Sequence, residues 1–205
     1  LDAQGLAQLA QCSAAITTEF ENVPAVALAT LGAQRPVAPT AEAVAVCQDR
    51  AAEKAQFTRS GVPCAPHLLI DSSQALAAVP DALLPGILKT ARLGYDGKGQ
   101  AVVADRAALA AAWQRLGQVP CVLEQKLPLA LELSVVVARN ATGALVQLPV
   151  QQNLHRDGIL AVTQVPAPDA SATLQRQAGA AAARLAADLG YVGVLCVEFF
   201  ITTDG

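Results

Sequence analysis

The stretch that decides the fold is residues 89–100, which read Lys-Thr-Ala-Arg-Leu-Gly-Tyr-Asp-Gly-Lys-Gly-Gln. An apolar run ends at Lys89 and the chain becomes apolar again over 101–103, with β-branched valines at 102 and 103, so the order is strand, glycine loop, strand. Because glycine has no Cβ, backbone N–H groups of such a loop can approach a ligand closely, and successive N–H groups form an anion-binding concavity. Lys89 and Lys98 add positive charge on either side. The pattern predicts a phosphate-binding loop, and the simplest ligand is a nucleotide.

A plain hairpin is the competing interpretation, because Asp-Gly between two strands is a strong turn signal. The loop also differs from two familiar phosphate-binding patterns. No helix with a Ser/Thr start follows it, as in the Walker loop, and its glycines do not open a helix, as in the dinucleotide fingerprint. The lysine on the preceding strand and the third glycine favour phosphate binding, but the residues alone leave both interpretations open.

Composition excludes several classes of protein. The chain has 205 residues, 53% of them hydrophobic and 15% charged, with a formal net charge of −3. That length suits one or two domains with a substantial core. The absence of a basic stripe argues against a nucleic-acid partner, and no apolar run approaches the ~18–20 residues of a membrane span. Five widely spaced cysteines without a Cys-x-x-Cys pair predict neither disulfides nor zinc, and indicate a reducing cytoplasm.

The predicted elements are antiparallel strands with helices packed on them, which indicates an α+β architecture. A polar loop containing His155 is expected over 152–158. Helices are expected over 41–59, 73–79, 105–116 (with Asp105 as N-cap) and 169–189. Strands are expected over 15–18, 67–70, 87–89, 101–103, 121–124, 131–139, 144–150, 158–165 and 192–202.

Three carboxylates, Glu124, Glu132 and Glu198, lie in or beside strongly apolar strands. A buried charge is costly unless it is paired or binds a metal, whereas a strand residue can also point to solvent. Both interpretations stay open for any one of them. Together with the glycine loop they predict a nucleotide site with Mg²⁺, which takes one or two carboxylates plus phosphate oxygens. Glu198, followed by two phenylalanines, is the strongest metal candidate.

The chain resembles the N5-carboxyaminoimidazole ribonucleotide synthetases, a family of ATP-grasp enzymes. The resemblance implies an ATP-grasp fold, α+β with antiparallel sheets and packed helices, plus a remnant of an α/β N-terminal domain. We expect that remnant over 1–45 and the ATP-grasp region, incomplete at its C-terminal end, over 46–205. The family's first glycine-rich loop and its segment after the last strand have no counterpart here, so both family termini are expected to be lacking. The matching motifs, in family order, lie at 18–24, 89–100, 124–125, 132–135, 153–160, 190–194 and 198–200.

This resemblance implies the ATP-dependent carboxylation of aminoimidazole ribonucleotide by bicarbonate, through carboxyphosphate, in de novo purine biosynthesis. It implies ATP and Mg²⁺ as cofactors, a cytoplasmic homodimer, and a pathway partner in the mutase that moves the carboxyl group. Two alternatives stay open. One is another ATP-grasp ligase, such as the formate-dependent glycinamide ribonucleotide transformylase, and the other is a module that binds ATP without chemistry.

The resemblance also implies residue roles, although it assigns no catalytic residue within the chain. Arg50 and Lys89 would contact the ATP phosphates, Glu132 the ribose hydroxyls, and His155 would line the pocket. Glu198 would hold Mg²⁺. The loop that closes over the phosphates comprises Gly94, Tyr95, Asp96, Gly97, Lys98, Gly99 and Gln100. The adenine segment, acting mostly through its backbone, comprises Glu124, Gln125, Lys126 and Leu127. The candidates for the ribonucleotide substrate are Glu19, Glu21, Tyr95 and Asp96.

Overall fold

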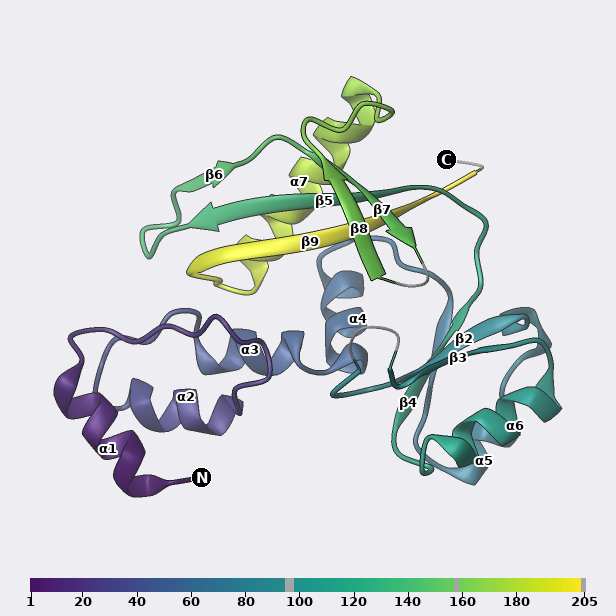
Figure 1. Cartoon of the computed structure of the whole chain (residues 1–205), viewed down its shortest axis with the longest axis horizontal. Coiled ribbons are helices and arrows are strands. Elements are labelled where there is room, and N and C mark those ends of the chain that lie inside the picture. The colour runs from purple at the N-terminus through teal and green to yellow at the C-terminus, as the bar shows by residue number, and fades with distance from the viewer. Residues whose placement is uncertain (95–97, 157–158, 204–205) are drawn as a thin grey trace. The chain divides into compact units, whose positions relative to one another are not determined.

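The computed structural model describes residues 1–94, 98–156 and 159–203 (Figure 1). The chain divides into two compact units, and each is made of segments that are distant in sequence. The first unit comprises Leu1–Gln48, Leu133–Gln152 and Gln164–Phe199. The second unit comprises Asp49–Glu132, Asn153–Thr163 and Phe200–Gly205.

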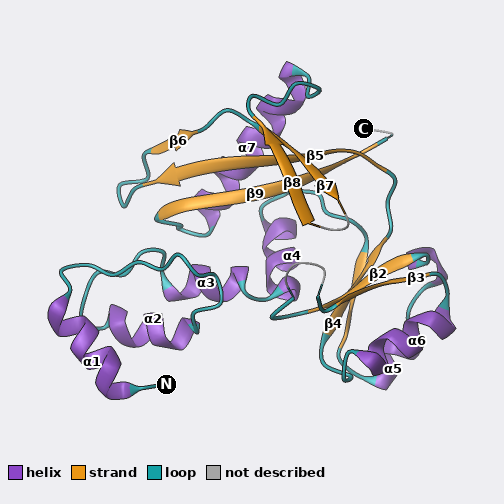
Figure 2. Ribbon diagram, in the orientation of Figure 1, coloured by secondary structure: helices purple, strands orange, loops and turns teal. Residues whose placement is uncertain are grey.

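The second unit contains a four-stranded antiparallel sheet in the order β1-β4-β2-β3. One face of this sheet packs against the helices α5 (Ser73–Ala77) and α6 (Arg106–Arg115), as Figure 2 shows, and against the 3-10 helix η1 (Asp81–Leu83). Leu88 and Leu123 lie at the centre of that core. Because side chains alternate along a strand, their neighbours point to the opposite face. The strands are β1 (His67–Ile70), β2 (Gly86–Thr90), β3 (Gln100–Val103) and β4 (Cys121–Gln125).

One continuous helix was expected over 41–59, and the structure divides it into α3 (Ala41–Cys47) and α4 (Arg50–Arg59). Asp49 causes the break, since its backbone is extended (φ −132°, ψ 110°) and its carboxylate accepts the N–H groups of Ala51 and Ala52. A capping carboxylate satisfies N–H groups that have no partner within the helix, which favours a new start over continuation. As a result, Arg50 is the first residue of α4, and its backbone N–H donates to the carbonyl of Ala91 (2.9 Å).

The first 48 residues are mainly helical. The strand expected over 15–18 is wrong in extent, because the structure contains only a single parallel bridge between Ile16 and Val37. Ile16 instead packs against two helices that were not predicted. These are α1 (Ala3–Cys12), capped by Asp2, and α2 (Ala25–Gly32). The alanine-rich α2 carries little helical periodicity, whereas the apolar residues of α1 do recur at helical spacing, and that signal was overlooked.

A second sheet has five strands in the order β6-β5-β7-β8, with β9 paired to β5. The helix α7 (Ala172–Asp188), capped by Ser171, packs close to β6 through Gly179, where an added Cβ would collide with the Gln147 side chain. The strands are β5 (Leu129–Arg139), β6 (Leu145–Gln147), β7 (Gln151–Arg156), β8 (Ile159–Gln164) and β9 (Gly193–Thr202).

Two expectations for this sheet are corrected. The polar loop predicted over 152–158 is largely the strand β7, with Asp157 and Gly158 outside the described residues. Polar residues of this strand find hydrogen-bond partners on the neighbouring strand. For example, the Thr163 hydroxyl donates to Oδ1 of the buried Asn153 (3.1 Å). The strand expected over 144–150 ends at Gln147, close to Pro149, which has no N–H to donate to a ladder. The predicted α+β class of antiparallel sheets with packed helices is confirmed.

Candidate nucleotide-binding site

Glu124 is the centre of a charge cluster in the second unit. Its Oε2 accepts from Nζ of Lys89 at 2.8 Å, and its Oε1 lies 3.0 Å from Nζ of Lys54. The side chains of Lys54 and Glu124 are only 9% and 14% exposed. A lysine is rarely buried unless it is paired, so the carboxylate and the two ammonium groups form one interdependent arrangement.

Strand register explains how these residues meet. Glu124 on β4 lies opposite Ile87 on β2, and Lys89 lies opposite Val122. Lys89 and Glu124 are therefore diagonal neighbours on the same face, within reach of long side chains. The helix α4 supplies the third member, Lys54, one turn after Arg50. Sequence reasoning missed Lys54, although its i, i+4 spacing from Arg50 places both on one helix face.

Burial and charge act in opposite directions on the carboxylates of this cluster. Burial by itself would raise the pKa of Glu124, but the charges and hydrogen bonds of Lys89 and Lys54 outweigh it and lower that pKa. For Glu53, on the same helix, burial prevails over Arg50 and the lysines and raises its pKa. Glu124 is therefore held as an anion, and the three cations Arg50, Lys54 and Lys89 outnumber the two carboxylates. Such a balance attracts anions.

Arg50 is bound to the start of the glycine loop. Its Nε donates to the carbonyl of Thr90 (3.1 Å) and its Nη2 to the carbonyl of Gly94 (3.2 Å). A guanidinium has five N–H donors, so further donors remain for a phosphate. In this structure, Arg50 positions the backbone that leads into the loop.

The described part of the loop has the predicted strand–loop–strand form. Thr90 N–H donates to the carbonyl of Gly99 (2.8 Å), and Gln100 pairs with Lys89 across the ladder. Gly99 adopts φ +72°, and a Cβ there would lie 2.7 Å from Oγ1 of Thr90. Glycine is therefore required at 99 by both conformation and space. Lys98 is exposed, and the predicted contacts of Tyr95, Asp96 and Gly97 lie outside the described residues.

The predicted adenine segment follows the Glu124 carboxylate at the end of β4. Two of its backbone donors are already engaged, since Gln125 N–H donates to the carbonyl of Pro66 (2.9 Å) and Lys126 N–H to that of Pro85 (3.0 Å). These two N–H groups are therefore not available to a ligand in this structure. These bonds connect the segment to the loop residues Pro66 and Pro85.

Glu132 and His155 were predicted as separate contacts, and the structure brings them together. They lie on β5 and β7, which are neighbours in the second sheet. His155 Nδ1 lies in direct contact with Glu132 Oε2, without the geometry of an ordinary hydrogen bond. Each side chain is between a quarter and a third exposed, at 29% and 27%. The pair can therefore still reach a ligand.

The remaining predicted site residues belong to the first unit. For Glu198 the sequence left burial and solvent exposure both open, and the structure decides for exposure. It is exposed on β9, and its neighbour Val197 is buried, because adjacent strand residues face opposite ways. Glu19 and Glu21 are also exposed, in a turn where Gln48 Nε2 donates to the carbonyl of Glu21 (2.7 Å). Within the residues that the structure describes, no group of three His, Cys, Asp or Glu side chains could hold a metal ion.

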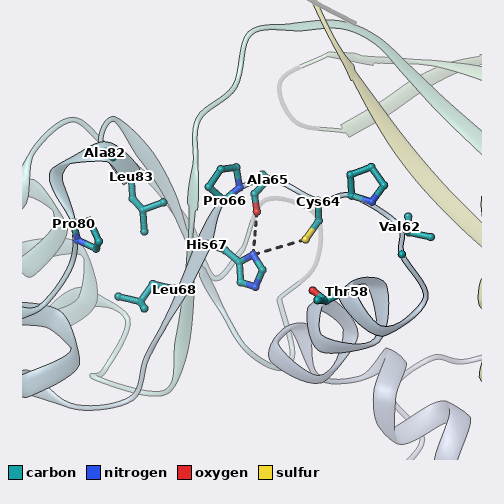
Figure 3. A pocket seen from close by; sticks show the side chains of 12 residues that line it. Thr58, Val62, Cys64, Ala65, Pro66, His67, Leu68, Pro80, Ala82 and Leu83 are labelled. Atoms are coloured by element: carbon teal, nitrogen blue, oxygen red, sulfur yellow. Dashed lines mark hydrogen bonds between the residues drawn. The ribbon is translucent and has the colours of Figure 1, made fainter.

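A hollow of about 700 Å³ lies elsewhere in the second unit, lined mainly by the loop 61–66 and η1 (Figure 3). Cys64 Sγ lies 3.8 Å from Nδ1 of His67, and the same nitrogen lies 3.0 Å from the carbonyl of Ala65. A carbonyl can only accept, so Nδ1 carries the proton and cannot take one from the thiol. This Cys-His pair is therefore not an activated nucleophile, and the hollow contains none of the predicted nucleotide contacts.

The fold and the lysine–carboxylate site define an ATP-grasp domain. A model of that family matches residues 55–205, and a ribonucleotide synthetase preATP-grasp domain model matches residues 1–48. The chain belongs to the ATP-grasp family.

Among described residues, no helix is long and apolar enough to cross a membrane.

Several similar proteins carry the same description. The chain is 41% identical, over its whole length, to the N5-carboxyaminoimidazole ribonucleotide synthase of Brucella melitensis and covers 57% of it. It is 39% identical to that of Pseudomonas aeruginosa, covering 100% of this chain and 56% of the relative. The solved synthetase of Thermus thermophilus superposes with a TM-score of 0.90 at 38% identity, covering 100% of this chain and 55% of that one. The chain thus spans about half the length of the relatives it matches.

Proposed function

We propose that the chain is the nucleotide-binding part of an N5-carboxyaminoimidazole ribonucleotide synthetase. The observation that carries the proposal is the juxtaposition of Lys89 and Glu124 beside a hairpin closed at Gly99. Its relatives named for this activity align over the whole chain. A solved synthetase that is 34% identical is described as an ADP complex. Residues 1–45 would contribute to the preATP-grasp domain and 46–205 to the ATP-grasp region.

The reaction would convert ATP, bicarbonate and aminoimidazole ribonucleotide into the N5-carboxylated ribonucleotide, ADP and phosphate. A bicarbonate oxygen attacks the γ-phosphorus, the bond to ADP breaks, and carboxyphosphate forms. The substrate amine then takes the carboxyl group, and phosphate leaves with the electrons of the carbon–oxygen bond. Such phosphoryl transfer depends mainly on positioning and charge stabilisation. Lys89, Arg50 and the loop 94–100 would provide both.

The ribose and the metal would be bound by the other carboxylates. Glu132 would accept hydrogen bonds from the ribose hydroxyls, with its orientation set by His155. The exposed carboxylate of Glu198 is a hard oxygen donor, which fits Mg²⁺ that keeps phosphate oxygens and waters as its other ligands. Bound Mg²⁺ would neutralise charge on the phosphates. Glu19, Glu21, Tyr95 and Asp96 are proposed contacts of the ribonucleotide.

By its resemblance to the synthetases, we propose that the protein acts as a cytoplasmic homodimer, working in sequence with the mutase that moves the carboxyl group. Neither nucleic acid nor a membrane has a part in the reaction.

The test is phosphate release from ATP and bicarbonate by the full-length protein, with and without aminoimidazole ribonucleotide. We expect release to require the ribonucleotide and to fall at least about tenfold in Lys89→Met, since that change removes one charge from the phosphate site. Phosphate release that does not depend on the ribonucleotide would rule out the substrate assignment. Release that depends instead on glycinamide ribonucleotide and formate would reassign the protein to the transformylases.

A further inference from the structure

We infer that Lys54 is a positioning residue of the nucleotide site, which keeps the ammonium group of Lys89 available for phosphate by holding the second oxygen of Glu124. The inference rests on the proposed function, because it assumes that Lys89 binds the nucleotide phosphates. It goes beyond that function by assigning a role to a residue that need not touch the nucleotide.

The geometry gives Glu124 two cationic partners. Lys54 lies 3.0 Å from Oε1 and Lys89 lies 2.8 Å from Oε2, so each carboxylate oxygen has its own ammonium group. Lys89 is the more exposed of the two, with 21% of its side chain accessible against 9% for Lys54. Lys54 is therefore the buried partner, and Lys89 is the one that a ligand can reach.

The charge balance explains why two partners matter. A carboxylate paired with Lys89 alone would neutralise it, and a phosphate would have to compete with that carboxylate for the ammonium group. With Lys54 in place, the three groups carry a net charge of about +1, and the attraction of Glu124 is divided between two cations. Opposite charges at these distances interact strongly where water is excluded. Removing Lys54 should therefore tighten the hold of Glu124 on Lys89 and weaken phosphate binding.

Neighbouring groups on α4 do not replace Lys54. Arg50 directs its Nε and Nη2 to the carbonyls of Thr90 and Gly94. Glu53 is a carboxylate on the same helix, so it adds negative charge. Lys54 is thus the described cation on α4 that contacts Glu124.

The experiment measures ADP and adenosine binding to the full-length protein by calorimetry. In Lys54→Met we expect ADP affinity to fall about tenfold and adenosine affinity to change less than twofold, since only ADP carries phosphates. Lys54→Arg, which keeps the charge, should stay within about threefold of wild type for both ligands. Lys54→Gln provides a second uncharged variant whose amide can still donate to Oε1, in case Lys54→Met does not fold. It should show the same selective loss.

The Glu124→Gln background provides the decisive comparison. Without the Glu124 charge, Lys89 has lost the carboxylate that it contacts directly, so adding Lys54→Met should have little further effect on ADP binding. Equal losses for ADP and adenosine, unchanged ADP binding in both uncharged variants, or the same loss in the Glu124→Gln background would overturn the inference. Wild-type protein that binds neither ADP nor ATP would instead reject the proposed function itself.

Discussion

Nζ of Lys54 lies 3.0 Å from Oε1 of Glu124, and both side chains are largely buried. This contact joins the helix α4 to the strand β4 and places a third charge beside the predicted phosphate ligand Lys89. The consequences are for stability as well as for binding, because each member of the cluster depends on its partners.

Glu124→Gln should destabilise the second unit at neutral pH. The change leaves two lysines close together without an anion, and we expect a loss of about 3 kcal/mol, the low end of the range for breaking a buried pair. The pKa of Glu124 is lowered from 4.5 in the folded state. The ionised carboxylate therefore stabilises the fold fully at pH values above 4.5, and this stabilisation is lost as the pH falls through the folded pKa. Urea denaturation at pH 7 and pH 3 should therefore show a smaller penalty at pH 3. An equal penalty at both values would contradict the ionic role.

Glu53→Gln should have the opposite sign. Burial raises the pKa of Glu53 in the folded state, so its ionised form disfavours folding above that pKa, and the cost disappears below the unfolded value. Removing the charge should raise the Tm at pH 7 and leave it nearly unchanged at pH 4. Thermal melts of both proteins at the two pH values measure this. A Tm lowered at pH 7 would mean that Glu53 is held by its cationic neighbours.

Gly99→Ala and Gly117→Ala form a matched pair. Both glycines have positive φ, +72° and +80°, but an added Cβ meets Thr90 at position 99 and nothing within 4 Å at position 117. Each substitution should cost about 1–2 kcal/mol from its backbone conformation. Only Gly99→Ala should also weaken ADP binding, because the loop must shift. Calorimetry with ADP separates the two, and equal affinities would remove Gly99 from the site.

Glu132→Gln should weaken binding of the ribose. We expect ADP affinity to fall about tenfold, or roughly 1.4 kcal/mol, since an amide accepts hydrogen bonds more weakly than a carboxylate. The affinity for an ADP analogue lacking both ribose hydroxyls should change much less. His155→Ala should shift ADP binding in the same direction, because the partner of Glu132 is lost. A loss that is equal for ADP and the analogue would indicate a structural role.

Glu198→Gln should reduce the Mg²⁺ dependence of ADP binding without changing binding in EDTA. The amide lacks the charge that Mg²⁺ prefers in its oxygen ligands. Because Glu198 is exposed, the Tm should stay close to that of wild type. Titration of ADP at several Mg²⁺ concentrations measures the effect, and an unchanged dependence would count against the metal role.

Features that depend on nearby residues could be predicted from the sequence. The glycine hairpin, the N-cap at Asp105 and the β-branched strands all follow from local preferences, and the structure confirms them. The break at Asp49 also has a local cause, because Asp49 caps the helix that follows it. It was missed because the apolar face over 41–59 favoured one continuous helix. The strand β7 was missed because its polar residues are satisfied by partners on another strand.

The sequence by itself determined the α+β class and the residue types of a nucleotide site, because glycine conformations, caps and alternating side chains are properties of short segments. Only the tertiary structure decided which charges meet. The register of β2 and β4 pairs Lys89 with Glu124, the packing of α4 adds Lys54, and the neighbouring strands β5 and β7 join Glu132 to His155. The packing of β9 also left Glu198 exposed. Such contacts depend on how distant segments are positioned in space, and no local pattern encodes that.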